Sequence, residues 1–184
     1  MSQEPATAPP GASERDLLDR LLVRVPALAG SMSAGLRRLQ PGSPLKRRLI
    51  NRQVKRAFAA MARSDVEVVL LSYEPDAEVW MKTMSGVGMS DCYRGYAGIR
   101  TLYADLDEVF GDWAWTARAV VDGGDCLAVR ADFVGHGRSS GVRTVVNDGG
   151  TAVKLSARGS VVWQEWFAEQ DGWKKTLEAV GLRE

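Results

Sequence analysis

The sequence predicts a single α+β domain in which helices come first and antiparallel strands follow. Three observations support this fold class. Apolar residues recur at helical spacing in residues 17–25, 50–61 and 99–110, apolar and polar residues alternate in most of the chain after Gly111, and glycine-rich turns separate those alternating runs. A chain of 184 residues that is 45% hydrophobic can bury one core but leaves little room for a second.

Residues 1–44 are predicted to form an N-terminal extension, and residues 45–184 the domain. The first twelve residues are rich in proline and poor in large apolar side chains, which is typical of disorder. Ser13 is a candidate N-cap, and the leucines after it predict a short amphipathic helix that ends at Pro26. The glycine-containing residues 30–42 are predicted to be a linker.

Three helices are predicted in the first part of the domain. Ser43 is the expected N-cap of the first helix, which carries an apolar stripe through residues 50–61. A capping box that begins at Ser64 indicates a second, short helix. The apolar stripe of residues 99–110 predicts the third helix, with Gly111 as its left-handed end.

Five strands are predicted, over residues 77–84, 113–121, 126–134, 142–157 and 161–167. The second and third are expected to pair across a glycine turn, because glycine adopts the positive φ that tight hairpins need. Residues 148–150, with the sequence Asp-Gly-Gly, are expected to form a bulge in the fourth strand. A closing helix is predicted near residues 173–180.

Composition and charge exclude several classes of protein. With 24 Lys+Arg against 23 Asp+Glu the formal net charge is +1, which argues against a nucleic-acid-binding protein. Cys92 and Cys126 are too few for a disulfide framework or a zinc cluster, so we expect neither a metal nor a cofactor. The acidic, proline-rich start differs from a signal peptide, and no apolar run is long enough to span a bilayer, which favours a cytoplasmic protein.

Several separated segments resemble the SnoaL-like members of the nuclear transport factor two-like superfamily. They are RAFAAMARSDVEVVLLSYEPDAEV (residues 56–79), YRGYAGIRTLYADLDEVFGDW (93–113), GSVVWQEWF (159–167) and LEAVGL (177–182). The resemblance implies a cystatin-like cone, in which a curved antiparallel sheet wraps around a long helix and encloses a pocket. It also implies a homodimer whose pocket binds a small, largely apolar molecule.

The reaction is left open by this resemblance, because the same scaffold serves cyclases, isomerases, hydrolases and binding modules without catalysis. The first hypothesis is a pocket protein with acid/base chemistry. The alternative is a non-catalytic dimeric interaction or ligand-binding module, with a basic N-terminal arm for a partner or a membrane surface.

Two carboxylates, Asp132 and Glu165, are the candidates for catalysis. SnoaL-like cyclases end their last strand with an inward His and Asp two residues apart, and the resemblance places Gln164 and Trp166 there, neither of which transfers a proton near neutral pH. Glu165 lies between them and is expected to face outward unless the strand has a bulge. Asp132 and Arg130 have the spacing of an Arg and Asp pair that activates water in limonene epoxide hydrolase. The alternative for Asp132 is an ion pair on the outer face of the sheet.

Six residues are expected to contact the ligand: Trp80, Tyr93, Tyr103, Phe110, Gln164 and Trp166. Aromatic side chains line apolar pockets, and tyrosine hydroxyl groups orient the polar atoms of a ligand. For the tryptophans the alternative is a packed core or a dimer face, since large aromatic side chains also bury much area there.

Residues 37–56 contain eight Lys or Arg residues and follow the amphipathic helix. One interpretation is that residues 14–56 bind anionic lipid or an acidic partner. The other is a solvated helix face with a linker that folds over its own or a partner subunit.

Overall fold

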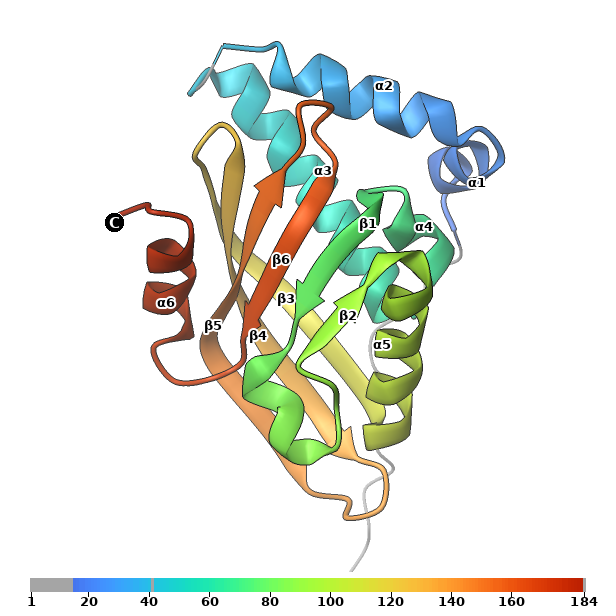
Figure 1. Ribbon diagram of the computed structural model, residues 1–184, viewed down its shortest axis with the longest axis vertical. Coiled ribbons are helices and arrows are strands. Elements are labelled where there is room, and N and C mark those ends of the chain that lie inside the picture. The colour runs from blue at the N-terminus through green and yellow to red at the C-terminus, as the bar shows by residue number, and fades with distance from the viewer. Residues whose placement is uncertain (1–14, 41, 184) are drawn as a thin grey trace, which may run out of the picture.

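The computed structural model describes residues 15–40 and 42–183 of the chain. Helices and one six-stranded sheet make up this part (Figure 1). In chain order the elements are α1 (Leu17–Arg24), α2 (Pro26–Arg37), α3 (Pro44–Ala62), α4 (Val66–Leu70), β1 (Tyr73–Trp80), a 3-10 helix η1 (Lys82–Val87), β2 (Cys92–Arg94), α5 (Gly95–Val109), β3 (Phe110–Asp122), β4 (Cys126–Gly137), β5 (Arg143–Leu155), β6 (Val161–Phe167) and α6 (Gly172–Ala179). The prediction of disorder for residues 1–12 concerns residues that lie outside the described part of the chain.

The sheet is curved and open, with the strand order β2-β1-β6-β5-β4-β3. All neighbouring strands are antiparallel except β1 and β6, which are parallel. This architecture confirms the predicted α+β cone. The run of antiparallel strands after α5 was evident from the alternation of side chains, whereas the parallel partner of β6 comes from much earlier in the chain.

Two helices cover the inner, concave face of the sheet and one covers its outer face. The main apolar core joins residues of α3, such as Ile50 and Phe58, and of α5, such as Leu106, to strand residues such as Val129 and Trp166. On the other face, α6 packs against β4 and β5, and a small second cluster joins Ala128, Trp173 and Leu177. Successive residues of β4 therefore serve different layers, as expected for a strand with side chains that alternate.

The predicted linker at residues 30–42 was wrong, because most of it belongs to helix α2. Pro26 occupies the first turn, where its fixed φ favours a helix and its missing N–H costs nothing. Glycine and serine weaken helix propensity, but Ala29 and Ser33 are buried against the rest of the protein. Packing therefore stabilises a helix that its own sequence barely favours.

Two predicted helix starts are also corrected. The side chain of Asp16, not of Ser13, caps α1 by accepting a hydrogen bond from the N–H of Asp19 at 2.6 Å. Asp65 caps α4 in place of Ser64, which adopts a positive φ of 51°. In both cases a carboxylate takes the position that the serine was expected to hold, and both residue types are good N-caps.

The first strand begins earlier than the predicted 77–84. It runs from Tyr73 to Trp80 and is followed by η1, because β1 pairs with β6 from Tyr73 onward. The register shifts between Tyr73 and Glu78, a stretch that includes Pro75, which cannot donate a hydrogen bond to a neighbouring strand. The short strand β2 lies in a segment for which no strand was predicted. In contrast, β6 has the predicted bounds, and β5 has its irregularity at Asp148, where φ is 66°.

Candidate ligand-binding site

The space between the helices and the concave face of the sheet has two parts, and one of them is filled by aromatic side chains. Trp115 lies 4.4 Å from Trp166 and 4.9 Å from Phe133 between ring centroids, and Phe58 lies 5.8 Å from Trp166. Two further pairs extend the group. We call this the aromatic core; its members are Phe58, Tyr103, Phe110, Trp113, Trp115, Phe133 and Trp166.

The other part is hollow. A cavity of about 110 Å³ lies between α2, α3 and the inner face of β4, β5 and β6. Its wall is mainly aliphatic, and the residues that line it include Leu36, Ile50, Val54, Leu127, Val129, Val153, Leu155 and Val161. An apolar cavity of this order of size admits a guest of a few heavy atoms, since engineered cavities of about 150 Å³ bind benzene.

A chain of buried hydrogen bonds forms the polar part of the cavity wall. Tyr73 of β1 donates from its hydroxyl group to the side-chain oxygen of Gln164 on β6. The amide nitrogen of Gln164 donates to the hydroxyl oxygen of Thr151 on β5 at 2.9 Å, and Thr151 donates to the carbonyl oxygen of Glu165 at 3.1 Å. All three side chains line the cavity, and Gln164 and Thr151 are almost fully buried. Burial raises the pKa of Tyr73, so its hydroxyl stays protonated and remains a donor.

A charged pair also borders the cavity. The Nζ atom of Lys46, in the first turn of α3, lies 2.9 Å from a carboxylate oxygen of Asp122 at the end of β3. The Lys46 side chain is only 4% exposed, so its charge requires this partner. The pair joins the start of α3 to the β3–β4 turn.

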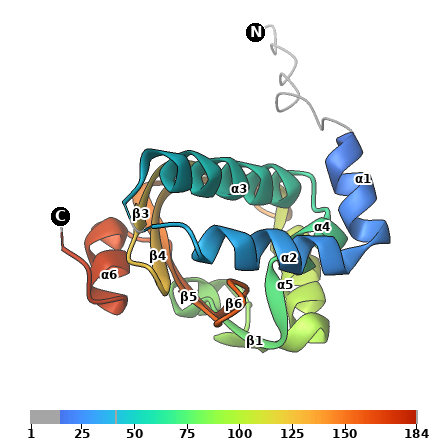
Figure 2. The ribbon, with the colours of Figure 1, turned by 90° about the horizontal axis from the view of Figure 1, so that it is seen from above.

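Helix α2 closes the cavity on the side that the sheet leaves open. Ser33, Leu36 and Arg37 contribute to the wall, and Figure 2 shows α2 crossing between α3 and the β5–β6 hairpin. Arg37 donates to the carbonyl oxygen of Ser156 in that hairpin at 2.9 Å, and Gln53 of α3 donates to the Ser33 hydroxyl at 3.4 Å. Few contacts thus hold this cover in place.

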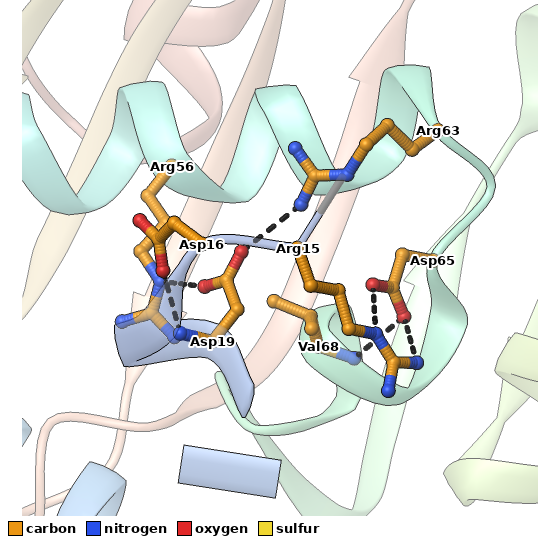
Figure 3. Close-up of polar contacts among 7 residues, drawn as sticks. All are labelled: Arg15, Asp16, Asp19, Arg56, Arg63, Asp65 and Val68. Carbon is orange, nitrogen blue, oxygen red and sulfur yellow. Dashed lines mark hydrogen bonds and ion pairs between the residues drawn. The ribbon is translucent and has the colours of Figure 1, made fainter. Parts of the chain in front are cut away.

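Ion pairs hold helix α1, which precedes α2, to α3 and α4 (Figure 3). The carboxylate of Asp19 is buried and contacts the guanidinium groups of Arg56 and Arg63, the latter at 3.0 Å. Arg15 donates two hydrogen bonds of 2.6 Å to the carboxylate of Asp65, and this interaction lowers the pKa of Asp65. The predicted extension is therefore attached to the domain by charge as well as by apolar contacts.

The two predicted catalytic carboxylates lie outside the cavity wall. Asp132 accepts a hydrogen bond of 2.7 Å from Arg118 and one of 3.2 Å from the N–H of Asp148. Glu165 lies 3.0 Å from Lys82, and its neighbours Gln164 and Trp166 are the side chains that point inward. The pairing of β5 with β6 is regular through Glu165, so no bulge turns it inward. A catalytic role for either carboxylate stays a prediction.

The six predicted ligand contacts are spread over three environments. Gln164 lines the cavity, whereas Tyr103, Phe110 and Trp166 belong to the aromatic core. Tyr93 is buried, and its hydroxyl donates to Asp105 at 2.5 Å and accepts from the N–H of Ser90. Trp80 is half-buried beside the Nζ atom of Lys82, 4.8 Å from its ring centroid. Only Gln164 of these residues is placed to touch a guest in the cavity.

Sequence reasoning missed most of the polar wall. Tyr73 lies 91 residues from Gln164 in the sequence, and Thr151 lies 13 residues from it on the preceding strand, so no local pattern links the three side chains. One usable signal was present, since the apolar stripe of residues 50–61 marked the face of α3 that lines the cavity. In residues 15–40 and 42–183 no cluster of His, Cys, Asp or Glu has the geometry of a metal site, and no helix has the length and hydropathy that crossing a bilayer requires.

The fold matches that of nuclear transport factor two-like proteins, as comparison with solved structures shows. A protein of that class of unknown function from Burkholderia pseudomallei aligns with a TM-score of 0.58 and 14% identity, over 70% of this chain and 94% of that one. TerC, crystallised with polyporic acid, aligns with a TM-score of 0.57 and 20% identity, over 70% of this chain and 97% of that one. A protein from Jannaschia sp. described as a SnoaL-like polyketide cyclase aligns with a TM-score of 0.56 and 20% identity, over 70% of this chain and 90% of that one. At these identities the likeness concerns the fold alone.

The family follows from the sequence. The SnoaL-like domain model matches residues 54–171, which is more than half of the chain, so this protein belongs to the SnoaL-like domain family. No curated protein matches the sequence. The match begins within α3, so α1 and α2 precede the part that the family model covers.

Proposed function

We propose that the cavity under α2 binds a small, largely apolar molecule that carries one oxygen acceptor. The observation that supports this most strongly is an aliphatic hollow with a single buried hydrogen-bond chain, Tyr73 to Gln164 to Thr151, in its wall. Apolar walls with a few oriented polar groups are the usual composition of ligand sites. The class of protein is consistent with this, since TerC was crystallised with an organic molecule, polyporic acid.

A hydrogen-bond donor of Gln164 that has no partner among the described residues of the cavity wall defines which group the guest must provide. The amide nitrogen of Gln164 has two N–H groups and uses one of them on Thr151. The second N–H needs an acceptor, because a buried donor without a partner costs about 1–3 kcal/mol. A hydroxyl or carbonyl oxygen on the guest meets this need.

Size limits the guest that fits without rearrangement. The cavity volume of about 110 Å³ is below the range of about 300–1,000 Å³ that is usual for drug-sized ligands. A guest larger than a single ring therefore requires α2 to shift. The sparse contacts of α2 with α3 and with the β5–β6 hairpin make it the element that can do so.

The cavity is better suited to binding than to proton transfer. Among the described residues that line it, the only carboxylate is Asp122, which is paired with Lys46. The raised pKa of Tyr73 keeps it neutral, so near neutral pH it is a donor and not a base. Acid/base chemistry would have to use Asp132 or Glu165 after a rearrangement, and this second hypothesis has its own test below.

Phenol is the probe for the binding proposal, because it combines one ring with one oxygen. Titration calorimetry of the full chain should detect phenol binding, and Ala57→Leu, which extends a side chain into the cavity, should abolish it. Ala59→Leu is the matched control, since Ala59 is on the exposed side of the same helix. Equal loss in both variants, or no loss in either, contradicts the proposal.

Comparing phenol with toluene separates the hydrogen bond from Gln164 from the fit of the ring in the cavity, because toluene has no oxygen. Gln164→Leu should weaken phenol binding by about 3–10-fold, the value of one hydrogen bond, and leave toluene binding unchanged. Asp132→Asn and Glu165→Gln should preserve the affinity for both probes. A carboxylate variant that loses affinity would show that the carboxylate reaches the guest, which the acid/base hypothesis requires.

A further inference from the structure

Charge is strongly segregated along this nearly neutral chain. Residues 15–56, which form α1, α2 and most of α3, contain eleven Lys or Arg and two Asp, a net charge of +9, whereas the whole chain has +1. The rest of the protein is therefore acidic. Such segregation creates a local positive potential that the overall charge conceals.

Exposed apolar side chains occur on the same helices as these charges. Leu45 is 57% exposed and Leu49 is 40% exposed, and both lie on α3. Met32 on α2 is 53% exposed. Large apolar side chains that remain in water on neighbouring helices indicate a surface with a partner.

The spacing on α3 brings the two kinds of side chain onto one face. Leu45, Arg48, Leu49, Arg52 and Lys55 recur at intervals of three and four residues and are all exposed. None of these three cations has an ion-pair partner among the residues that the structure describes. We call the surface formed by Met32, Leu45, Arg48, Leu49, Arg52 and Lys55 the basic apolar face.

A groove connects the two helices of the basic apolar face. It measures about 470 Å³ and lies between α1, α2 and α3, with Met32, Leu45, Leu49 and Arg52 among the residues that line it. The exposed leucines of α3 and the methionine of α2 therefore border one continuous depression. Figure 2 shows α2 next to α3 in the view from above, and Figure 1 shows the two helices diverging from their connection.

We propose that the basic apolar face docks the protein on an anionic membrane surface. Helical surfaces with Lys or Arg beside leucine lie in the bilayer interface, where apolar side chains enter the acyl boundary and cations meet lipid phosphates. The charge of +9 complements the negative potential of anionic lipid. Nucleic acid would satisfy the cations but would leave Met32, Leu45 and Leu49 in water.

The docked orientation has a geometric consequence. The groove and the internal cavity share five lining residues, Ser33, Leu36, Gln53, Ala57 and Ser72. Docking through this face therefore places the cover of the cavity against the bilayer. The docking proposal does not depend on ligand binding, and its test uses no ligand.

Vesicle sedimentation of the full chain tests the proposal directly. The protein should pellet with vesicles of phosphatidylcholine mixed with phosphatidylglycerol, much less with phosphatidylcholine alone, and less in high salt. Arg48→Gln combined with Arg52→Gln should weaken binding to the anionic vesicles by about 25-fold, since each cation contributes about fivefold. The matched control is Arg143→Gln with Lys174→Gln, which removes the same charge from exposed positions on β5 and α6 and should change binding little.

A second variant tests the apolar part of the face. Leu45→Ser with Leu49→Ser keeps every charge and should also weaken vesicle binding, because two inserting side chains are lost. Thermal melts should be near wild type for all these variants, since the replaced side chains are exposed. Equal binding to both kinds of vesicle, equal loss in the control, or salt-sensitive binding to duplex DNA without binding to vesicles overturns the proposal. Loss of self-association in the Leu45 and Leu49 variant without a change in vesicle binding overturns it as well, in favour of a contact between two copies.

Discussion

The aromatic core and the cavity lie side by side on the concave face of one sheet, yet one is filled and the other is hollow. Strand β6 illustrates the cause, because it contributes Trp166 to the aromatic core and Gln164 to the cavity from positions two residues apart on the same face. The tryptophan packs against Trp115 and Phe58, whereas the shorter amide forms hydrogen bonds along the wall. The size and polarity of individual inward side chains, and not the fold, therefore decide where this domain has room.

The two regions also differ in what covers them. The aromatic core is covered by α5, which packs on β1, β2 and β3, and by α3, which packs on β3 and contributes Phe58. The cavity is covered by α2, which touches α3 through Gln53 and the β5–β6 hairpin through Arg37. The hollow part of the protein is thus also the part with the weaker cover, which is what ligand entry requires.

The largest expected effect is the loss of ring packing in the aromatic core. Trp166→Ala should lower the free energy of unfolding by about 3–5 kcal/mol, because it removes a large buried ring and leaves a void. Val153→Ala, in the cavity wall, should cost about 1–2 kcal/mol, since Val153 already borders empty space on one side. Urea unfolding measures both. Similar losses at the two sites would break the contrast between a filled and a hollow region.

Next in size is the anchor of the cover. Asp19→Asn should lower the free energy of unfolding by about 2 kcal/mol. Breaking a fully enclosed ion pair costs about 3–5 kcal/mol, but here α1 can open and return Arg56 and Arg63 to water. Hydrogen exchange in α1 and α2 should accelerate while exchange in β4 and β5 stays slow. Arg15→Gln, which breaks a pair whose arginine is exposed, is the control and should cost less than about 1 kcal/mol. Uniform acceleration across the sheet would show that the cover is not a separate unit.

An effect of similar size is expected where α2 meets the β5–β6 hairpin. Gly159 has a φ of +83°, and a Cβ atom there would lie 2.8 Å from the carbonyl oxygen of Ser33 on α2. Gly159→Ala should therefore cost about 2 kcal/mol and displace α2, which phenol titration would register as a changed affinity. Gly181→Ala has the same backbone strain, with φ of +68°, but no atom within 4 Å, so it should cost about 1 kcal/mol and leave phenol binding unchanged.

The smallest effect on stability near neutral pH is expected from the ionisation of buried tyrosines, which occur both in the aromatic core and in the cavity wall. Burial raises the pKa of Tyr73 and of Tyr103, and burial together with the Asp105 carboxylate raises that of Tyr93 to about 12. Tyrosines of the unfolded chain ionise near pH 10. The stabilisation that the raised pKa values represent is therefore complete below about pH 10 and is lost as the pH rises toward 12. Tyrosinate absorbance should rise together with alkaline unfolding. A tyrosinate signal that rises while the circular dichroism stays native would show that these hydroxyl groups are accessible.

Local pattern was enough to predict much of the scaffold. Alternation in residues 161–167 placed Gln164 and Trp166 inward and Glu165 outward, and the regular pairing of β6 with β5 agrees. The stripe of residues 50–61 identified the inward face of α3, and the Asp-Gly-Gly sequence at 148–150 located the irregularity in β5. These features depend on residues that are neighbours in sequence, so short-range periodicity and backbone preference were sufficient.

The site itself was decided by tertiary structure. The sequence by itself determined an α+β chain with an amphipathic α3, a late antiparallel sheet and a basic N-terminal segment. Only the folded molecule turned residues 26–37 into a helix, joined Tyr73 to Gln164 across 91 positions, and paired Lys46 with Asp122. The physical reason is that a helix with weak propensity, a buried hydrogen bond and a buried charge pair all gain their stability from partners distant in the chain, and local sequence contains no record of those partners.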